Sequence, residues 1–233
     1  MKTLLQIVQQ FCNATGLNPP LGVVSSTDSQ IVQILALMNE GLDSLAMKPW
    51  AQLQQEATFT STAVESQGAL ETIAPGFRSI IPDTFWNLTN KLPANGSISP
   101  KNTQILKVWG APSAYTQFRE VNGELHLIPA VGVGTQYRFE YNSQNLVQAA
   151  DLTTKQYFTA DTDVPLIPDN IIIADLRWRW KAEKELAYAE NFRTFENLCK
   201  QSLVNSATKT PLRMGSPPAR TMPGIVVPLG SWQ

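Results

Sequence analysis

The spacing of apolar residues changes twice along this chain, and that change constrains the fold more than any other feature. Near the N-terminus apolar residues recur every three or four positions, as on one face of a helix. From about residue 55 to 142 they alternate instead, as in half-buried strands. Helical spacing returns over 170–205. The pattern predicts an α+β fold, with a small antiparallel β-domain inserted between the helices of one bundle.

Two helices are predicted before the β-domain. The first covers residues 3–15 and ends at Gly16, a common helix stop. The second covers about 28–47, where Thr27 and Gln30 have the spacing of a capping box at its start.

After the β-domain, a loop over 151–169 rich in Asp and Pro leads to one long helix over 170–205. Asp169 or Asn170 would cap this helix. Its apolar stripe is predicted to pack on the two N-terminal helices and complete the bundle; it comprises Leu176, Trp180, Ala187, Phe192, Phe195, Cys199 and Leu203. The expected divisions of the chain are 1–54 (N-terminal helices), 55–150 (inserted β-domain), 151–206 (loop and long helix) and 207–233 (C-terminal arm).

The clearest hairpin signal lies at Asn122-Gly123, between apolar runs at 118–121 and 125–128. Asn-Gly suits the two positive-φ positions of a type I′ turn. Tyr137, Phe139 and Tyr141 alternate with charged residues, which predicts a half-buried strand. The run 70–73 is also predicted as a strand, and the apolar run 105–109 is assigned to the same β-domain.

Charge excludes one class of function and suggests another. The formal net charge is −1, so the chain as a whole has no basic field to hold nucleic acid. Charged residues make up 16% of the sequence, below the usual quarter, which fits a protein that buries surface against copies of itself. The sequence contains no run of about 18 apolar residues, so no membrane span is predicted. The N-terminus does not resemble a signal peptide.

Few residues could carry catalysis. The only histidine, His126, lies in a predicted strand opposite Leu125 and Leu127, on the face expected to be exposed. One histidine leaves little basis for a Ser/His/Asp site or a His-rich metal site. Cys12 and Cys199 lie in helical patterns and are predicted to be small buried residues, rather than a disulfide, a metal pair or a nucleophile.

Two glycine- or acid-containing motifs fail on spacing. The acids in 159–163 resemble the start of a calcium loop, but Leu166 and Ile172 stand where such a loop needs Gly and Glu. Loop capping is the better role for these aspartates. Gly132 and Gly134 are interpreted as a hairpin turn, since no helix follows them to form a nucleotide site. No cofactor or metal is expected.

A basic cluster on the predicted long helix alternates with Trp178 and Trp180, a combination found in nucleic-acid sites. Glu183 and Glu185 neutralise it, and the tryptophans are expected to point away from the basic face. A solvated or inter-subunit charged face is therefore expected. The candidate interface residues are Arg177, Arg179, Lys181 and Lys184.

The last segment, 207–233, contains five prolines, three glycines, three basic residues and no acid. Such a segment cannot build its own core. It could be a disordered tail or an arm that binds a partner subunit by strand addition or groove docking; its apolar residues favour the arm. The candidate contact residues are Leu212, Met214, Ile225, Val226, Val227, Leu229 and Trp232.

Two segments carry a resemblance to a known family. One is PGFRSIIPDTFWN at 75–87. The other, which is the more specific, is YFTADTDVPLIPD at 157–169 followed by LRWRWKAEKELAYAENFRTFE at 176–196. Over about residues 1–205 the chain resembles the head-to-tail adaptor, or connector, family of short-tailed bacteriophages. The resemblance implies a structural protein of the virion neck, assembled in the host bacterial cytoplasm. Some members of the family have been linked to cell-wall hydrolysis, but no enzymatic activity is expected here because the sequence offers no catalytic arrangement of residues. The resemblance also implies a homo-oligomeric ring, usually a dodecamer. The ring would bind the portal protein, receive the tail nozzle or tail-tube proteins, and continue the channel for DNA ejection.

Three alternatives stay open. The chain could be another neck or tail-tube component. It could be a virion-associated peptidoglycan hydrolase, although the sequence nominates no pair of carboxylic acids for that reaction. It could also be a DNA-binding module, against which the net charge argues.

Overall fold

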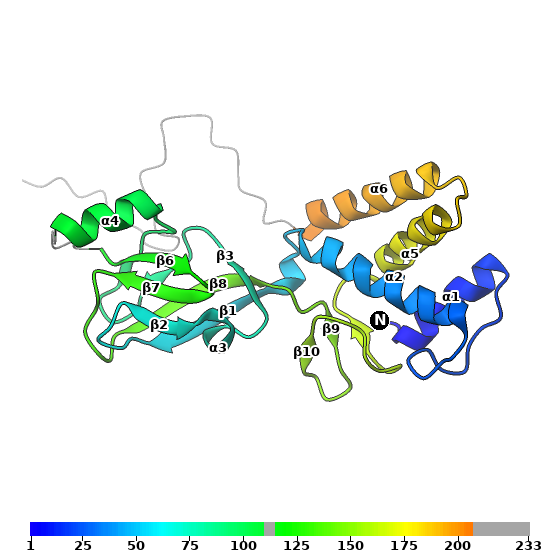
Figure 1. Ribbon diagram of the computed structural model, residues 1–233, viewed down its shortest axis with the longest axis horizontal. Helices are drawn as coiled ribbons and strands as arrows, with labels where there is room; N and C mark the ends of the chain where they lie inside the picture. Colours follow the sequence, from blue (N-terminus) through cyan, green and yellow to red (C-terminus); the bar gives the residue numbers. More distant parts are fainter. Residues whose placement is uncertain (110–114, 207–233) are drawn as a thin grey trace, which may run out of the picture.

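The computed structural model describes residues 1–109 and 115–206. These residues form two parts arranged along the long axis of the molecule, one helical and one built mainly of strands (Figure 1). The helical part contains α1 (Leu4–Thr15), α2 (Ser29–Ala46), α5 (Asp169–Glu183) and α6 (Ala189–Ser206). Mixed helices and small antiparallel sheets confirm the α+β class. None of the helices in the described ranges is long and apolar enough to cross a membrane.

Helix α5 is the centre of the helical part, because it packs against α1, α2 and α6. The apolar faces of the four helices share one buried core, which includes Leu4, Ile34, Leu176 and Trp180. Trp180 meets Phe11 of α1 edge to face, with ring centroids 5.9 Å apart. Ridges of large side chains on α5 therefore hold the N-terminal helices to the C-terminal ones.

A small sheet lies beside these helices. It has the order β10-β9-β11 and is formed by β9 (Val147–Gln148), β10 (Thr154–Lys155) and β11 (Val164–Pro165).

The β part consists of two antiparallel sheets. The first has the order β1-β8-β4-β5, with β3 also paired to β8. The second has the order β2-β7-β6. Their strands are β1 (Gln54–Thr60), β2 (Ser66–Ala69), β3 (Phe77–Ile80), β4 (Trp86–Asn87), β5 (Leu92–Pro93), β6 (Gln117–Val121), β7 (Glu124–Ile128) and β8 (Gln136–Ser143).

Residues from both sheets share a second buried core that is largely aromatic. Phe85 of the loop before β4 contacts Phe118 of β6, with ring centroids 4.5 Å apart, and Phe139 of β8, at 5.2 Å. These rings bury large areas and are the main source of hydrophobic stabilisation in this part.

The two parts are joined through Trp50 and η1 (Ala51–Leu53), which lead from α2 into β1. The Trp50 side chain is fully buried in the helical core, and its indole Nε1 donates a hydrogen bond to the Leu45 carbonyl oxygen at 2.8 Å. The predicted boundaries between the parts stay a prediction.

Several sequence predictions are confirmed. The hairpin joins β6 to β7, and Asn122 and Gly123 have positive φ angles of 52° and 75°. In β8, Tyr137, Phe139 and Tyr141 are buried and alternate with exposed residues. Gly16 caps α1 in the left-handed conformation.

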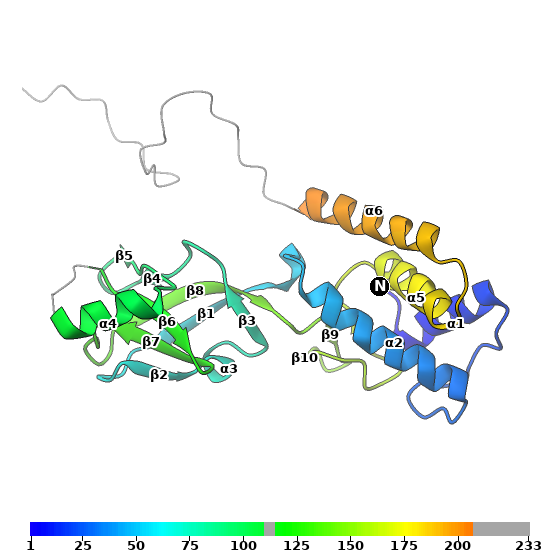
Figure 2. The same cartoon turned by 45° about the horizontal axis from the view of Figure 1, so that its top comes forward.

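The prediction of one long helix over 170–205 is wrong. The chain reverses direction after α5, and α6 packs back against it (Figure 2). Glu185 takes a left-handed conformation, with φ of 56°, at the turn. The segment contains no glycine or proline to mark this break. The reversal brings the Phe192 ring against Trp178, with ring centroids 5.1 Å apart. Tertiary packing, not a local sequence signal, therefore determines where the chain turns. Ala187, which is predicted to lie on the apolar stripe, is exposed in the turn.

Two apolar runs in the β part are helical. Residues 70–73 form the single turn α3 (Leu70–Ile73), not a strand, and the run 105–109 belongs to α4 (Pro100–Trp109). Ser99 before α4 accepts a hydrogen bond from the Asn102 amide at 3.3 Å, and Pro100 occupies the first turn. Ser-Pro is a helix-start signal, and here it outweighs the strand-like composition of its neighbourhood.

Three local assignments also need correction. Asp28, not Thr27, caps α2, since its carboxylate accepts from the Gln30 amide at 2.9 Å. Neither Asp169 nor Asn170 caps α5; the Asp169 carboxylate accepts from the Lys2 backbone amide instead. The glycines at 132 and 134 do not form a hairpin, because β7 and β8 belong to different sheets.

Candidate functional site

The predicted basic cluster on α5 does not form one surface. Arg179 is buried, which makes its placement on an exposed charged face wrong. Its guanidinium donates to Asp175 Oδ2 at 2.9 Å, Glu40 Oε1 at 2.7 Å and Ser44 Oγ at 2.8 Å. It also lies over the Trp178 ring, 4.7 Å from the centroid. Arg179 therefore binds α5 to α2 inside the protein.

Asp175 completes this buried network, because its second carboxylate oxygen accepts from Trp178 Nε1 at 2.9 Å. Burial raises the pKa of the Asp175 carboxyl above its ordinary value, against the opposing effect of Arg179. Gly41 of α2 makes room for the group: a Cβ at this position would lie 2.1 Å from Asp175 Oδ2. The two helices approach closely only because this residue has no side chain.

The other three basic residues are distributed around α5. Lys181 is half-buried and donates to Asn191 Oδ1 at 2.7 Å, which ties α5 to α6. Lys184 is exposed, donates to Gln33 Oε1 at 2.9 Å and lies 4.6 Å from the Trp180 ring centroid. Arg177 is exposed and remains a candidate for contact with a partner.

The aspartate-rich segment before α5 acts as a set of loop caps. The Asp161 carboxylate accepts from the amides of Val23 and Val24, at 3.0 and 2.9 Å, and so fixes the loop between α1 and α2. The carbonyl oxygens of residues 161 and 163 accept from the first amides of α1. The predicted capping role is confirmed for these residues, and it holds the chain's first helix in place.

Asp163 is the buried member of this set. Burial alone would raise the pKa of its carboxyl, but Lys155 and the amides of Thr159 and Ala160 donate to Oδ2 at 2.8 Å each, and the pKa is lowered below its usual value. The carboxylate is therefore held in its charged form.

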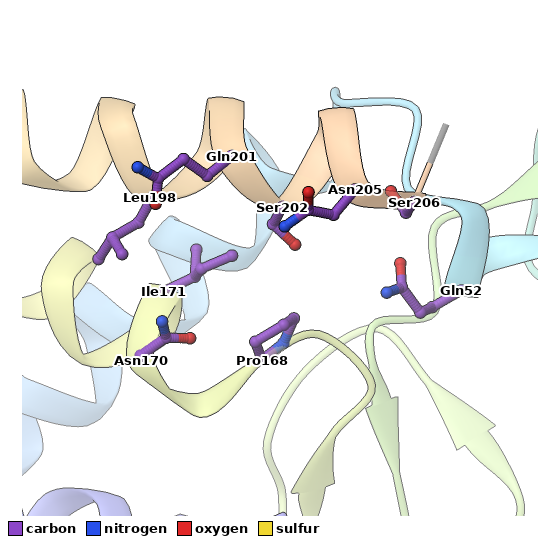
Figure 3. A pocket seen from close by; sticks show the side chains of 9 residues that line it. All are labelled: Gln52, Pro168, Asn170, Ile171, Leu198, Gln201, Ser202, Asn205 and Ser206. Atoms are coloured by element: carbon purple, nitrogen blue, oxygen red, sulfur yellow. The ribbon is translucent and has the colours of Figure 1, made fainter. Parts of the chain in front are cut away.

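The helical part carries a shallow depression of about 430 Å³ at the C-terminal end of α6 (Figure 3). Its walls come from α6, from the start of α5 and from η1. The lining residues are Gln52, Pro168, Asn170, Ile171, Leu198, Gln201, Ser202, Asn205 and Ser206. None of them carries a charge, so the depression offers hydrogen bonds to a polypeptide but no acid or base for catalysis.

A second depression continues from the first through the shared residues Asn170 and Leu198. It adds the charged residues Lys2, Asp169 and Arg177, so a polar strip with a small excess of positive charge runs along α1, α5 and α6. Sequence reasoning missed this strip, because its residues come from four segments and none forms a local motif.

Elsewhere in the described ranges, the residue types that could carry catalysis or bind a metal do not cluster. His126 lies opposite Leu125 and Leu127 as predicted, but it is half-buried rather than exposed, and its Nε2 is 3.7 Å from Glu124 Oε2 on the strand surface. Cys12 and Cys199 are both buried, as predicted, and burial raises the pKa of each thiol. Among the described residues, no group of three His, Cys, Asp or Glu side chains could hold a metal ion.

The remaining candidate contacts lie outside the described residues: Leu212, Met214, Ile225, Val226, Val227, Leu229 and Trp232. The described chain ends at Ser206, at the edge of the depression in Figure 3. Comparison with protein-family models finds no match for this sequence, and no curated protein matches it.

Proposed function

We propose that this chain is a structural adaptor of a bacteriophage neck. Copies of it form a ring, twelve-fold by resemblance to the connector family, between the portal and the tail nozzle. DNA passes through the ring without sequence-specific binding. In this proposal the helical part is a bundle that contacts the portal, and the β part is an insertion that faces the tail.

The observation that carries the proposal is the use of the segment most distinctive of that family, residues 157–196. Its polar residues hold the protein together. The carbonyl oxygens of Asp161 and Asp163 fix the start of α1, and the Asp161 carboxylate fixes the loop that follows α1. Asp175 and Arg179 join α5 to α2. An enzyme would direct such residues into a cleft around a substrate. Here they support a scaffold whose outer surfaces are free for contact.

Charge supports a channel or spacer role over DNA binding. Of the four basic residues between 177 and 184, Arg179 belongs to the internal network and Arg177 is exposed. Lys181 and Lys184 bond to other helices of the helical part. No continuous basic surface arises from them, whereas phosphate binding draws its affinity from several clustered cations.

The test is to mix the purified full-length chain with the portal protein of the same virus and to separate the products by sedimentation. We expect the chain to co-sediment with the portal in a fixed ratio. A chain that stays monomeric beside its portal would contradict the proposal.

Two further assays separate the alternatives. A peptidoglycan zymogram should show no clearing, since clearing would indicate a hydrolase. Retention on duplex DNA should be weak at low salt, since strong retention that falls steeply with salt would indicate a DNA-binding module.

A further inference from the structure

Among the described residues, strand β1 has one edge that pairs with no other strand. It is seven residues long and pairs only with β8 among the described strands, in a continuous register from Gln54↔Asn142 to Thr60↔Gln136. It contains no proline or glycine, and no bulge interrupts the pairing. A long regular edge of this kind is a template for another strand.

The pairing of β8 shows which backbone groups of β1 face its outer edge. Gln136 and Glu140 direct their carbonyl oxygens to Leu88 and Ile81, on the side of β8 away from β1. In an antiparallel pair, opposite residues either bond to each other or both point away. The backbone N–H and C=O groups of their partners Thr60 and Glu56 therefore point away from β8. Those of Thr58, which lies between them, do the same.

Positions 56, 58 and 60 thus present unpaired N–H and C=O groups at the edge, and their side chains are exposed. Three residues can form up to about six backbone hydrogen bonds with an added strand, since each contributes one donor and one acceptor.

Other strand edges in the described ranges are protected. β5 has two residues and one of them is Pro93. β2 is short and its register shifts within it. The outer side of β6 is bonded by the segment around Asn95 and Ile98. Short strands, proline and irregular pairing all discourage strand addition. The same holds for β3, whose register also shifts, and for β10 and β11, which have two residues each. Among the described edge strands, only β1 has neither short length, proline nor irregular pairing.

The chain itself offers a matching strand. Residues 225–227 are Ile-Val-Val, three consecutive β-branched residues, in a segment outside the described ranges. Pro228 follows, which suits the outer side of an added strand because that side needs no N–H.

Position and charge agree with this pairing. The described chain ends at Ser206, which shares a depression with Gln52, two residues before β1. The residues between 206 and 225 could span roughly 60 Å when extended, enough to pass beyond one copy's β1. The full chain has a formal net charge of −1, and 207–233 contributes +3 from three basic residues and no acid, so residues 1–206 carry −4. The segment is therefore attracted to the body of a copy.

We infer that residues 225–227 of one copy add as a strand to the free edge of β1 in a second copy. This inference rests on the proposed function, because a ring is what places the segment of one copy beside β1 of the next. It names the contact that would link neighbouring copies.

The test uses two full-length chains with different tags, one carrying Thr58→Cys and the other Val226→Cys, mixed with and without the portal and mildly oxidised. The native Cys12 and Cys199 are buried and should not react. Moving the second cysteine to Ile225 and Val227 should give a two-residue periodicity in cross-linking, since alternate side chains lie on opposite faces. The matched control is Val133→Cys, in an exposed loop.

We expect cross-links between the two tags at Thr58 to exceed those at Val133 several-fold. Val227→Pro, which removes an N–H on the side of the added strand that faces β1, should abolish them in the Val226→Cys chain, whereas Val227→Thr should preserve them. Both changes lie outside the described body, so loss of folding would not explain the difference.

Three results would overturn the inference: equal cross-linking at Thr58 and Val133, linkage only within a single chain that carries both cysteines, or linkage of residue 226 to the portal alone. Portal binding without the cross-link would leave the adaptor proposal standing and remove this contact. The cross-link without portal binding would do the reverse. Absence of both would remove both.

Discussion

At the residue scale, buried polar groups decide how the helices fit together. The sequence placed Arg179 on a charged surface, because its neighbours on the helix are basic and aromatic. In the structure its partners Glu40 and Ser44 lie more than 130 residues earlier in the chain. Such a pairing becomes visible only once α2 and α5 are in contact. The caps at Asp161 and Asp163 could be predicted, because aspartate in a turn bonds nearby amides.

Loss of the Arg179 guanidinium should be costly. In Arg179→Met, Asp175 would keep its buried carboxylate without its main partner, and breaking a buried ion pair costs about 3–5 kcal/mol. We expect the free energy of unfolding, measured with urea, to fall by an amount near the lower end of this range. The reason is that the Glu40 carboxylate can return to water. The control Arg177→Met, an exposed position on the same helix, should change stability by less than about 0.5 kcal/mol. Equal effects would refute the role assigned to the network.

Asp163 predicts a dependence on pH. Its pKa is lowered in the folded protein, so its contribution to stability is present above the ordinary aspartate pKa and is lost as pH falls through the folded value. Asp163→Asn should therefore be destabilised relative to the native chain at pH 7, and the difference should shrink towards about pH 3. Urea midpoints at several pH values measure it, with Asp83→Asn in an exposed turn as the control. A difference that does not vary with pH would contradict the assignment.

At the element scale, apolar spacing predicted where helices and strands form, but it did not predict where the chain reverses direction. The bounds of α1, α2 and β8 follow from apolar spacing, and Asn122-Gly123 fixed the β6–β7 hairpin. The α5–α6 reversal has no such signal, because Glu185 is not a residue that favours a left-handed conformation. It exists because α6 gains aromatic contacts with Trp178 only by turning back. A tertiary contact of this kind cannot be inferred from local spacing.

The strained turn gives a prediction of opposite sign to the usual one. Glu185→Gly should raise stability by about 0.5–1 kcal/mol, because glycine takes the left-handed conformation without a steric cost. The same change at Lys200, an exposed position within α6, should lower stability by about 1 kcal/mol. Thermal midpoints of the two variants measure the contrast. Destabilisation by both would mean that the turn is not strained.

At the scale of the whole molecule, the α+β class could be predicted from sequence, but the candidate contact surfaces could not. The polar strip joins residues of α1, α5, α6 and η1, and the free edge of β1 is defined by what does not pair with it. Both depend on the complete arrangement of elements.

The arm hypothesis yields a prediction at this scale. A chain lacking residues 207–233 should keep its circular dichroism spectrum, since both buried cores lie within residues 4–199. It should fail to assemble stably, because the apolar residues of the deleted segment are proposed to link it to a partner. Normal assembly of the truncated chain on the portal would refute this role.

The most direct measurement of the central claim is an electron-microscopic reconstruction of the portal complex formed with the full-length chain. The account predicts a closed ring of copies stacked coaxially on one end of the portal, with an open channel through its centre. Portal particles without added density, beside a chain that remains monomeric in the same sample, would contradict it.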